Sequence, residues 1–469
     1  MNARALAALI LVAALSLSPQ LSLAAPKNAA PAAPPASAPA APVPVSYALE
    51  PIPPPAAPPA SEGPPLTLAE ALARAKDASP DLAVARERVA QSQNNLSRAY
   101  SAFQPTLTAN GSYTRNSAEF GTPYNGALIV TQPSNQLQAN LTGQITLFNA
   151  RAFPALDTAK DQIEINKLNE TQLRRETLLS VAATYLLGLQ QKELLSAAFR
   201  RSQASRDQLR QARSRYEAGL LQKAAAVRAQ LDAVSADQEA RRQTFALQAT
   251  KSQLAALLDR HDTAFELTAS PDLSAEQKGS FQELLKKALS ERPEVASQKL
   301  NEQITARVRS DAWAQFWPTV NLTGAARTNN NDLFPGQDRV TWAITLAASL
   351  PLYDGGFRYA QLKDAASQER QATAQARSTA IRIEDELRRA LLDLETARVL
   401  RDTSAQSLKV AEENERLARA QFEAGTSTQI EVSDAEASLY QAEAAALQQK
   451  LAVQLSALRL AKAVGAFEP

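Results

Sequence analysis

Residues 357–422 read FRYAQLKDAASQERQATAQARSTAIRIEDELRRALLDLETARVLRDTSAQSLKVAEENERLARAQF, without one Gly or Pro. The segment consists largely of Ala, Leu, Gln, Glu and Arg, which favour the α-helix. A single helix of this length extends about 100 Å, roughly three times the diameter of a small domain. Because a globular core cannot bury such a helix, the segment predicts a coiled coil, a long bundle or a helical barrel.

A second helical run follows after a short break. The break is GTST at 425–428, and residues 429–464 again lack Gly and Pro. A glycine with positive φ ends a helix and lets the chain reverse, so the two runs predict an antiparallel helical hairpin. The same pattern occurs earlier, where residues 155–216, with Gly188 as their only glycine, lead through YEAG at 216–219 into a helical run to about residue 259.

Four other segments alternate with a period of two residues. Residues 106–114, 136–148, 320–326 and 340–348 place apolar residues at every second position, and the intervening positions are uncharged. Such alternation over about ten residues is typical of membrane β-strands. The alternative is a soluble β-sandwich, but soluble strands are usually shorter and their wet faces usually carry charges. Between the first two segments, residues 116–135 are rich in Gly, Pro and Asn and are expected to form a loop.

Aromatic residues gather where the expected strands meet the expected helices. This placement is typical of the aromatic belts at membrane interfaces, although core residues of a soluble sandwich would be an alternative. The candidate interface residues are Phe103, Phe148, Trp317 and Tyr353, with Trp313, Phe316, Phe357 and Tyr359 close by in the sequence.

The chain is a tandem duplication. The interval from Pro80 to Pro105 equals that from Pro293 to Pro318, and FQPT at 103–106 matches FWPT at 316–319. Each half gives short helices, a β-hairpin and a long helical hairpin. We therefore expect a first repeat at 66–270, with a β-hairpin at 105–148 and a helical hairpin at 155–260, and a second repeat at 271–469, with hairpins at 318–353 and 357–464. In the first repeat, Thr67 and Glu70 predict a capping box.

The first 65 residues carry no signal for a packed fold. Residues 1–24 combine Arg4, an apolar run and a Ser-Leu-Ala site, which predicts a secretory signal peptide. The apolar run is shorter than the roughly 20 residues that a spanning helix needs. Residues 25–65 hold more than half of the 27 prolines and predict a mostly disordered tether. A spacer that threads through or binds the cell wall is the alternative for this segment.

Composition excludes several classes of protein. The balance of 50 Lys and Arg against 48 Asp and Glu leaves no field to attract nucleic acid. There is no Cys and one His, which excludes disulfides, thiolate chemistry, Cys/His zinc sites and lipid anchoring through Cys. We find no catalytic constellation and no phosphate-binding loop, so we expect neither an enzyme nor a cofactor, and we expect His261 to be a surface residue.

Four strands are too few for a closed membrane barrel, since the smallest ones have about eight. Open edges are not tolerated in lipid, so several copies must pool their strands. Two copies would give an interior filled by side chains, whereas three or more leave an aqueous lumen. A channel therefore predicts at least a trimer, in which helices that continue from the strands wall a long tube.

The whole arrangement resembles the TolC-type outer-membrane efflux protein family. The resemblance covers about residues 66–464 and is carried by the two repeats, by LYDGGFR at 352–358 and by the turns at 216–219 and 422–425. It implies an α-helical barrel plus a membrane β-barrel, to which each chain of a homotrimer contributes four β-strands and two long helical hairpins. It also implies the cell outer membrane of a Gram-negative-type bacterium, with the helical part in the periplasm.

The function that this resemblance implies is the exit duct of a tripartite efflux pump or of a type I secretion system. The implied partners are outer-membrane lipid, a periplasmic adaptor (membrane fusion protein) and an inner-membrane pump. A trimeric adhesin and a non-conducting, envelope-spanning structural protein are the alternatives, and conductance is expected only of the channel. The sequence does not distinguish drugs, metals or proteins as cargo.

In the family, the turns of the helical hairpins lie at the periplasmic entrance, where adaptor hairpins dock. The resemblance therefore implies adaptor contacts at Gly219, Leu220, Leu221, Gly425, Thr426 and Ser427. The two glycines are equally well explained by turn geometry alone. The two leucines, on an exposed tip, favour a partner in the trimer or on the adaptor.

Glu431 and Asp434 match an acidic pair that family members place at the constriction of this entrance. Three copies would arrange these carboxylates in a ring that favours cations and is able to bind a metal ion. Stabilisation by the helix dipole is the alternative explanation for acids this early in a helix. The equivalent stretch of the first repeat, residues 223–228, has no acid. Family members carry Tyr and Arg where this chain has Phe422 and Ser427, so a closing network built on those hydrogen bonds is in doubt.

Overall fold

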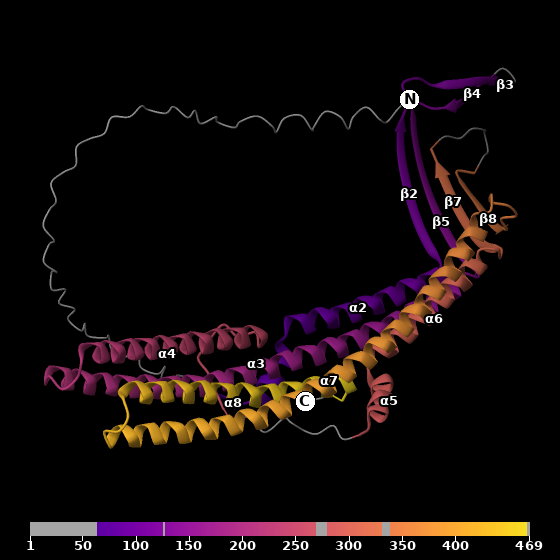
Figure 1. Ribbon diagram of the computed structural model, residues 1–469. Coiled ribbons are helices and arrows are strands. Elements are labelled where there is room, and N and C mark those ends of the chain that lie inside the picture. Colours follow the sequence, from indigo (N-terminus) through magenta and orange to yellow (C-terminus); the bar gives the residue numbers. More distant parts are fainter. Residues whose placement is uncertain (1–62, 125–126, 269–278, 331–337, 467–469) are drawn as a thin grey trace, which may run out of the picture. The chain divides into compact units, whose positions relative to one another are not determined.

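The computed structural model describes residues 63–124, 127–268, 279–330 and 338–466. These residues fall within one compact unit, residues 51–469. The predicted signal peptide and residues 25–62 of the predicted tether lie outside the described residues. Within the described part, the chain forms short helices, strands and a long helical hairpin, and then repeats this order (Figure 1).

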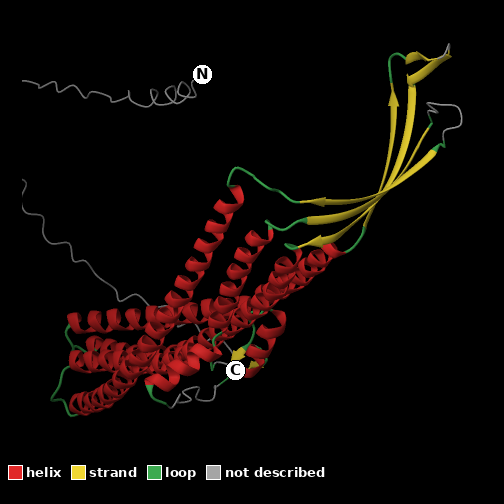
Figure 2. Cartoon of the chain, turned by 90° about the vertical axis from the view of Figure 1, so that its right-hand side faces the viewer, coloured by secondary structure: helices red, strands yellow, loops and turns green. Residues whose placement is uncertain are grey.

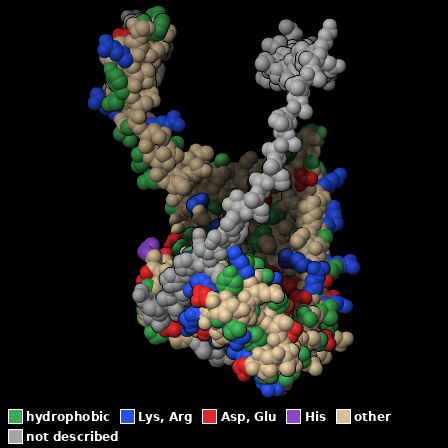
Figure 3. Space-filling model, turned by 60° about the vertical axis from the view of Figure 1, so that its left-hand side comes forward, with side chains coloured by type: hydrophobic (Ala, Val, Ile, Leu, Met, Phe, Trp, Pro, Cys, Tyr) green, Lys and Arg blue, Asp and Glu red, His purple; other side chains and the backbone are tan. Residues whose placement is uncertain are grey.

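Two long helical hairpins confirm the prediction from the Gly- and Pro-free segments. Helix α3 has 66 residues and α7 has 67, and each returns through a shorter helix that packs against it. The bounds are α3 Ala152–Glu217, α4 Lys223–Leu257, α7 Phe357–Glu423 and α8 Gln429–Val464. On the face shown in Figure 3, Lys and Arg side chains are intermixed with Asp and Glu over the helical part of the surface.

The shorter helices also occur in corresponding pairs. They are α1 Leu68–Ala78, α2 Pro80–Tyr100 and the 3-10 turn η1 Ser101–Phe103 in the first repeat, and α5 Phe281–Glu291 and α6 Pro293–Ala314 in the second. Helix α6 ends at Ala314, four residues before Pro318, and the residue before a proline disfavours the helical conformation.

The predicted capping box at the start of α1 is confirmed. The backbone N–H of Glu70 donates to Thr67 Oγ1 at 3.2 Å, and the N–H of Thr67 donates to Glu70 Oε2 at 2.9 Å. The second repeat has the same device at the start of α5, where Ser280 and Glu283 exchange bonds of 2.8 and 3.3 Å. Both repeats therefore begin their helices in the same way.

The four long strands form one antiparallel sheet in the order β2-β5-β7-β8 (Figure 2). The two predicted hairpins, β2-β5 and β7-β8, are confirmed, and pairing of β5 with β7 joins the two repeats, with Gly143 opposite Gly324. The bounds are β2 Thr106–Arg115, β5 Asn135–Asn149, β7 Thr319–Asn329 and β8 Val340–Ser349. Strands β2 and β8 are the edges of this sheet.

The prediction of a plain loop at 116–135 is wrong. This segment contains an antiparallel pair of short strands, β3 Phe120–Tyr124 and β4 Ala127–Gln132. Gly121 and Pro123 favoured the loop prediction, and they interrupt the two-residue alternation by which the four long strands were predicted. Proline is tolerated in a strand that has an edge, and β3 pairs with β4 alone in its two-stranded sheet.

One face of the four-stranded sheet is apolar and exposed. The register brings Leu107, Leu141, Leu322 and Leu346 to this face. Trp342 is 75% exposed and Leu107 is 74% exposed. Soluble proteins rarely expose so many large apolar side chains on one continuous face, so this face indicates a contact with lipid or protein. Among the described helices, by contrast, none is long and apolar enough to cross a membrane.

The main core surrounds the middle of α3. Tyr185 is fully buried there, and its hydroxyl lies 2.7 Å from the carbonyl oxygens of both Leu66 and Thr268. These carbonyls flank a short parallel pair, β1 Pro65–Leu66 with β6 Glu266–Leu267. Gly188 lies one turn further along α3, where an added Cβ would come within 2.5 Å of Leu267 Cδ1. The only glycine of α3 therefore allows the chain segment after α4 to pack closely against the helix.

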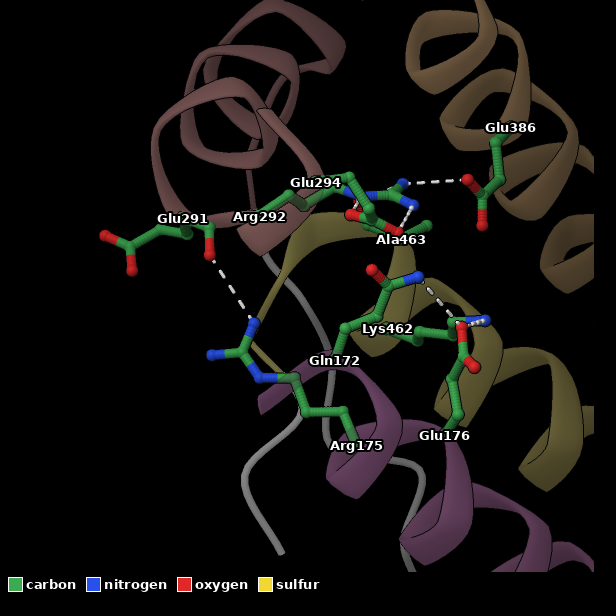
Figure 4. Close-up of polar contacts among 9 residues, drawn as sticks. All are labelled: Gln172, Arg175, Glu176, Glu291, Arg292, Glu294, Glu386, Lys462 and Ala463. Carbon is green, nitrogen blue, oxygen red and sulfur yellow. Dashed lines mark hydrogen bonds and ion pairs between the residues drawn. The ribbon is translucent and has the colours of Figure 1, made fainter. Parts of the chain in front are cut away.

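A second core, between α5, α7 and α8, ends in a buried polar cluster (Figure 4). Arg292, 6% exposed, holds Glu294 through two bonds of 2.9 and 3.0 Å and Glu386 of α7 through a third of 2.8 Å. Its Nη1 also lies 3.4 Å from the carbonyl oxygen of Ala463 in α8. These contacts tie the start of α6 to both helices of the second hairpin.

Candidate functional site

The tips of the two helical hairpins have the same backbone geometry. Gly219 and Gly425 have φ angles of 73° and 76°, in the left-handed region that glycine adopts without strain. The N–H groups of Leu220 and Thr426 donate to the carbonyl oxygens of Arg215 and Gln421 at 2.8 and 2.9 Å. This bond is the six-to-one bond of a Schellman motif, so the turn itself accounts for both glycines.

The side chains at the tips differ in exposure. Leu220 is 79% exposed, whereas Leu221 packs against the cluster of Leu209 and Ala212 inside its own hairpin. The inference that both leucines need a partner is therefore weakened for Leu221, whose apolar contacts lie within the chain. On the second tip, Thr426 Oγ1 donates to the carbonyl oxygen of Gln421 at 3.1 Å.

The candidate acidic pair lies in the first turns of α8, and both side chains are exposed. The backbone N–H of Glu431 donates to Oγ1 of Thr428, the cap of the helix, at 3.4 Å. A hydrogen bond from the Ser427 hydroxyl lowers the pKa of Glu431, and hydrogen bonds from Thr428 lower it further. Ser427 therefore supports the charge of Glu431, a role that the comparison with the family's Arg at this position did not suggest.

Asp434 has a cationic neighbour that sequence reasoning missed. Arg228 of α4 places Nη2 at 3.8 Å from Asp434 Oδ1 and Nε at 3.5 Å from Asp232 Oδ1. The first hairpin thus contributes a positive charge beside the acidic pair, although its stretch 223–228 has no acid. Both partners are largely exposed, so the attraction is weak and sensitive to salt.

Above the tip, a row of polar contacts joins α8 to the first hairpin, and we refer to it as the seam. Ser433 and Tyr440 of α8 are seven residues apart, as are their partners Asp232 and Glu239 of α4, so the two helices lie side by side in a fixed register. The seam contacts are Ser433 Oγ to Asp232 Oδ2 at 2.7 Å, Gln208 Nε2 to Glu436 Oε1 at 2.6 Å, Tyr440 Oη to Glu239 Oε1 at 2.8 Å, and Arg200 to Glu443.

The interior of the first hairpin is of a different kind. Leu209 and Ala212 of α3 pack against Ala229 and Ala233 of α4 in a small apolar cluster. The hairpin also contains the pair of Arg206 with the buried Asp237, which in addition accepts a bond from the buried Ser202. Polar groups of the seam regain hydrogen bonds to water when they separate, whereas apolar contacts do not. The hairpin is therefore the firmer unit and the seam the weaker junction.

Three groups of the seam have perturbed pKa values. Burial acts to raise the pKa of Glu239, but hydrogen bonds from Gln243, Arg242 and Tyr440 lower it. Burial raises the pKa of Glu436, against the opposing effect of Arg419 of α7, whose Nη2 lies 3.0 Å away. Burial and the Glu239 carboxylate raise the pKa of Tyr440, so this hydroxyl stays protonated and donates. Arg201 lies 5.2 Å from the centre of the Tyr440 ring. Among the described residues, no cluster of His, Cys, Asp and Glu is arranged to hold a metal ion.

The candidate interface aromatics lie where strands and helices join. The rings of Phe148 and Trp317 are 6.4 Å apart, and that of Phe103 is 5.5 Å from Phe153 at the start of α3. The structure thus brings residues of both repeats together at this level. Tyr353 is 87% exposed.

The LYDGGFR motif builds the junction between β8 and α7. Gly355 and Gly356 have positive φ angles, and the Asp354 carboxylate accepts from the N–H of Gly356 and of Arg358 at 3.2 Å each. Arg358 Nε also donates to Asp354 at 2.7 Å, while its guanidinium lies 4.6 Å from the centre of the Phe316 ring. The motif is thus a helix start that is fixed to the end of α6.

Comparison with known proteins gives a consistent result. The family model described as outer membrane efflux protein matches residues 71–260 and 284–466. Outer membrane protein OprJ of Pseudomonas aeruginosa is 29% identical over 167 residues, a match that spans about a third of each protein. The outer membrane protein VceC of Vibrio cholerae shares 21% identity and a TM-score of 0.69, covering 85% of this chain and 96% of that one. The Campylobacter jejuni CmeC outer membrane channel shares 17% identity and a TM-score of 0.73, covering 86% of both.

Proposed function

Because the chain belongs to the outer membrane efflux protein family, we propose that three copies of it form the outer-membrane channel of a tripartite efflux pump. Efflux is chosen over type I secretion because the family description is one of efflux. Membership in this family agrees with the prediction that the chain is not an enzyme. The single observation that carries the proposal is the four-stranded sheet, which has two unpaired edges and an exposed apolar face.

The open edges argue for assembly. Each neighbouring pair in the sheet is antiparallel, so β2 and β8 run in opposite directions. The β8 edge of one copy therefore suits antiparallel pairing with β2 of the next. In hydrocarbon each unpaired backbone group costs several kcal/mol, so the sheet is stable there only when a ring of copies closes it.

Unpartnered apolar side chains on the helices argue the same way. On α4 and on the C-terminal half of α7 they recur at spacings of three, four, seven or eleven residues, which place them on one face of a helix. These residues are Val227, Leu231 and Val234 on α4, and Leu392, Val399, Val410 and Leu417 on α7, among the exposed apolar side chains of the two helices. Neighbouring copies in a helical barrel would cover both stripes.

The hairpin tips form the periplasmic entrance in this proposal. Glu431 and Asp434 of three copies line the aperture, and Arg228 offsets part of their charge. Gly219, Leu220, Gly425, Thr426 and Ser427 present the surface on which a periplasmic adaptor docks, with Leu220 as its main apolar contact. Leu221 supports that surface from within the hairpin.

The test is electrical. The purified protein, shown by native mass spectrometry to be trimeric, is inserted into planar bilayers, and single-channel current is recorded with and without millimolar Mg²⁺. We expect a small current that Mg²⁺ on the tip side blocks, and a larger, less sensitive current in Glu431→Gln/Asp434→Asn. Absence of current from a trimer, in wild type and variant, would refute the channel and leave a structural or adhesive role.

A further inference from the structure

The polar face of the four-stranded sheet carries a single charge. On each strand the residues that alternate with the apolar set form the opposite face, and they are Thr, Asn, Gln, Ser or Ala with one exception. The exception is Arg327 of β7. The register sets it between Asn140 of β5 and Thr341 of β8, which both lie on the polar face.

Arg327 lies close to the end of the sheet that is remote from the helices. Strand β7 begins at Thr319, five residues after α6 ends at Ala314, and runs away from the helices. At about 3.3 Å per residue, Arg327 stands roughly 26 Å along it. Because the strands of a membrane barrel tilt by about 35–45°, this length corresponds to a height of roughly 20 Å, near the outer edge of an apolar band about 25 Å tall.

The guanidinium of Arg327 is available to a ligand. The residue is exposed, and its side chain makes no ion pair with any residue that the structure describes. The polar face of the described strands offers no carboxylate to neutralise it. The other charged residue of these strands, Arg115, lies at the end of β2 with the parity of Tyr113, on the apolar face.

We propose that Arg327 makes the outer end of the lumen a binding ring for oxyanions, the phosphate or carboxylate groups of small solutes. The inference rests on the proposed trimeric channel, in which the polar face lines the water-filled lumen. Three copies place three guanidinium groups at one height, within a wall of low dielectric that strengthens their field. Rings of Arg or Lys select anions in pores, and a guanidinium matches the geometry of phosphate and carboxylate oxygens.

The proposal gives the duct opposite charges at its two ends. The entrance ring of Glu431 and Asp434 favours cations, whereas the Arg327 ring at the outer end favours anions. A solute with both kinds of group, or an anion accompanied by its counterion, would meet a complementary charge at each end. The outer ring would also hinder negatively charged solutes of the exterior from passing inward while they are bound to it.

The experiment measures block by pyrophosphate in planar bilayers. The side from which Mg²⁺ blocks the current identifies the orientation of each channel, and pyrophosphate is then added to the other side. We expect a voltage-dependent reduction of the wild-type current, and a concentration for half block that is about tenfold higher in Arg327→Gln. Arg327→Lys should retain most of the block. Arg115→Gln removes the same charge from the other face of the sheet and should leave the block unchanged.

The outcomes separate the two proposals. A conducting wild type that pyrophosphate does not block, or equal block in wild type and Arg327→Gln, overturns the anion ring and leaves the channel intact. If Arg115→Gln loses as much of the pyrophosphate block as Arg327→Gln does, the anion ring is also overturned, because the block would then depend on the net charge of the protein and not on the position of Arg327. Absence of current in every variant overturns the channel and the ring together.

Discussion

In the proposed channel, replacing Tyr440 with Phe should make the tips of the helical hairpins separate more easily. The change removes one hydroxyl from the seam between α8 and the first hairpin, where Tyr440 Oη donates to Glu239 Oε1 at 2.8 Å. Phenylalanine keeps the ring beside Arg201. The substitution therefore removes one bond across the junction that we expect to separate when the entrance widens.

The magnitude follows from what Glu239 retains. Its carboxylate keeps Gln243 Nε2 at 2.8 Å and Arg242 Nη2 at 2.7 Å, so it is not left without a partner. The loss is then the net value of one hydrogen bond to a charged group in a partly buried place, about 1.5 kcal/mol. This value shifts the ratio of closed to open tips about tenfold for each copy.

The assay is the open probability of single channels at fixed voltage. Tyr216→Phe is the matched control, because it removes a hydroxyl near the tip that makes no hydrogen bond to any described residue. We expect a higher open probability in Tyr440→Phe and no change in the control. An unchanged open probability in Tyr440→Phe, with the trimer intact, would refute the view that the seam holds the tip closed.

Three further predictions concern stability, each measured by denaturant unfolding of the purified protein in detergent. In Gly188→Ala, the contact of the added methyl group with Leu267 should lower the free energy of unfolding by about 1–3 kcal/mol, of which the higher helix propensity of Ala restores about 1 kcal/mol. A variant more stable than the wild type would contradict the close packing at Gly188. Arg292→Met should cost about 3–5 kcal/mol because Glu294 loses its buried partner. The control Arg389→Met breaks an exposed ion pair with Asp385 and should lower the free energy of unfolding by under about 1 kcal/mol. Equal losses of stability in Arg292→Met and Arg389→Met would refute the view that the buried pair matters more than the exposed one. Because the folded state raises the pKa of Glu436, its contribution to stability is present at low pH and is lost as pH rises through that pKa. The stability of Glu436→Gln relative to the wild type should therefore increase as the pH rises above the ordinary glutamate pKa of 4.5, and parallel pH profiles would exclude the effect.

The sequence was sufficient for the elements whose signals are local. Gly- and Pro-free segments rich in Ala predict α7 and α8, and the glycines at 219 and 425 predict the two reversals. Strict alternation predicts the four long strands. The pair β3 and β4 was missed because Gly121 and Pro123 conceal its period, and only pairing across the loop stabilises it.

The candidate site was less predictable because its contacts join segments about two hundred residues apart. The two bonds of the seam from α8 to α4 each span 201 residues. No local pattern shows which face of α8 meets the first hairpin, nor that Arg228 approaches Asp434. For the seam, the one signal in the sequence was the seven-residue spacing of Asp232 and Glu239. It becomes meaningful only when Ser433 and Tyr440, with the same spacing, are aligned with it.

The two open edges of the sheet have a consequence for how the protein matures. In the proposed channel, a lone copy in the bilayer would leave β2 and β8 without partners, so we expect stable insertion to wait until other copies are present. The rate of assembly would then rise steeply with the local number of copies. Trp342, Ile344 and Leu346 are exposed in a single copy. We therefore expect unassembled copies to be prone to aggregation through this apolar face.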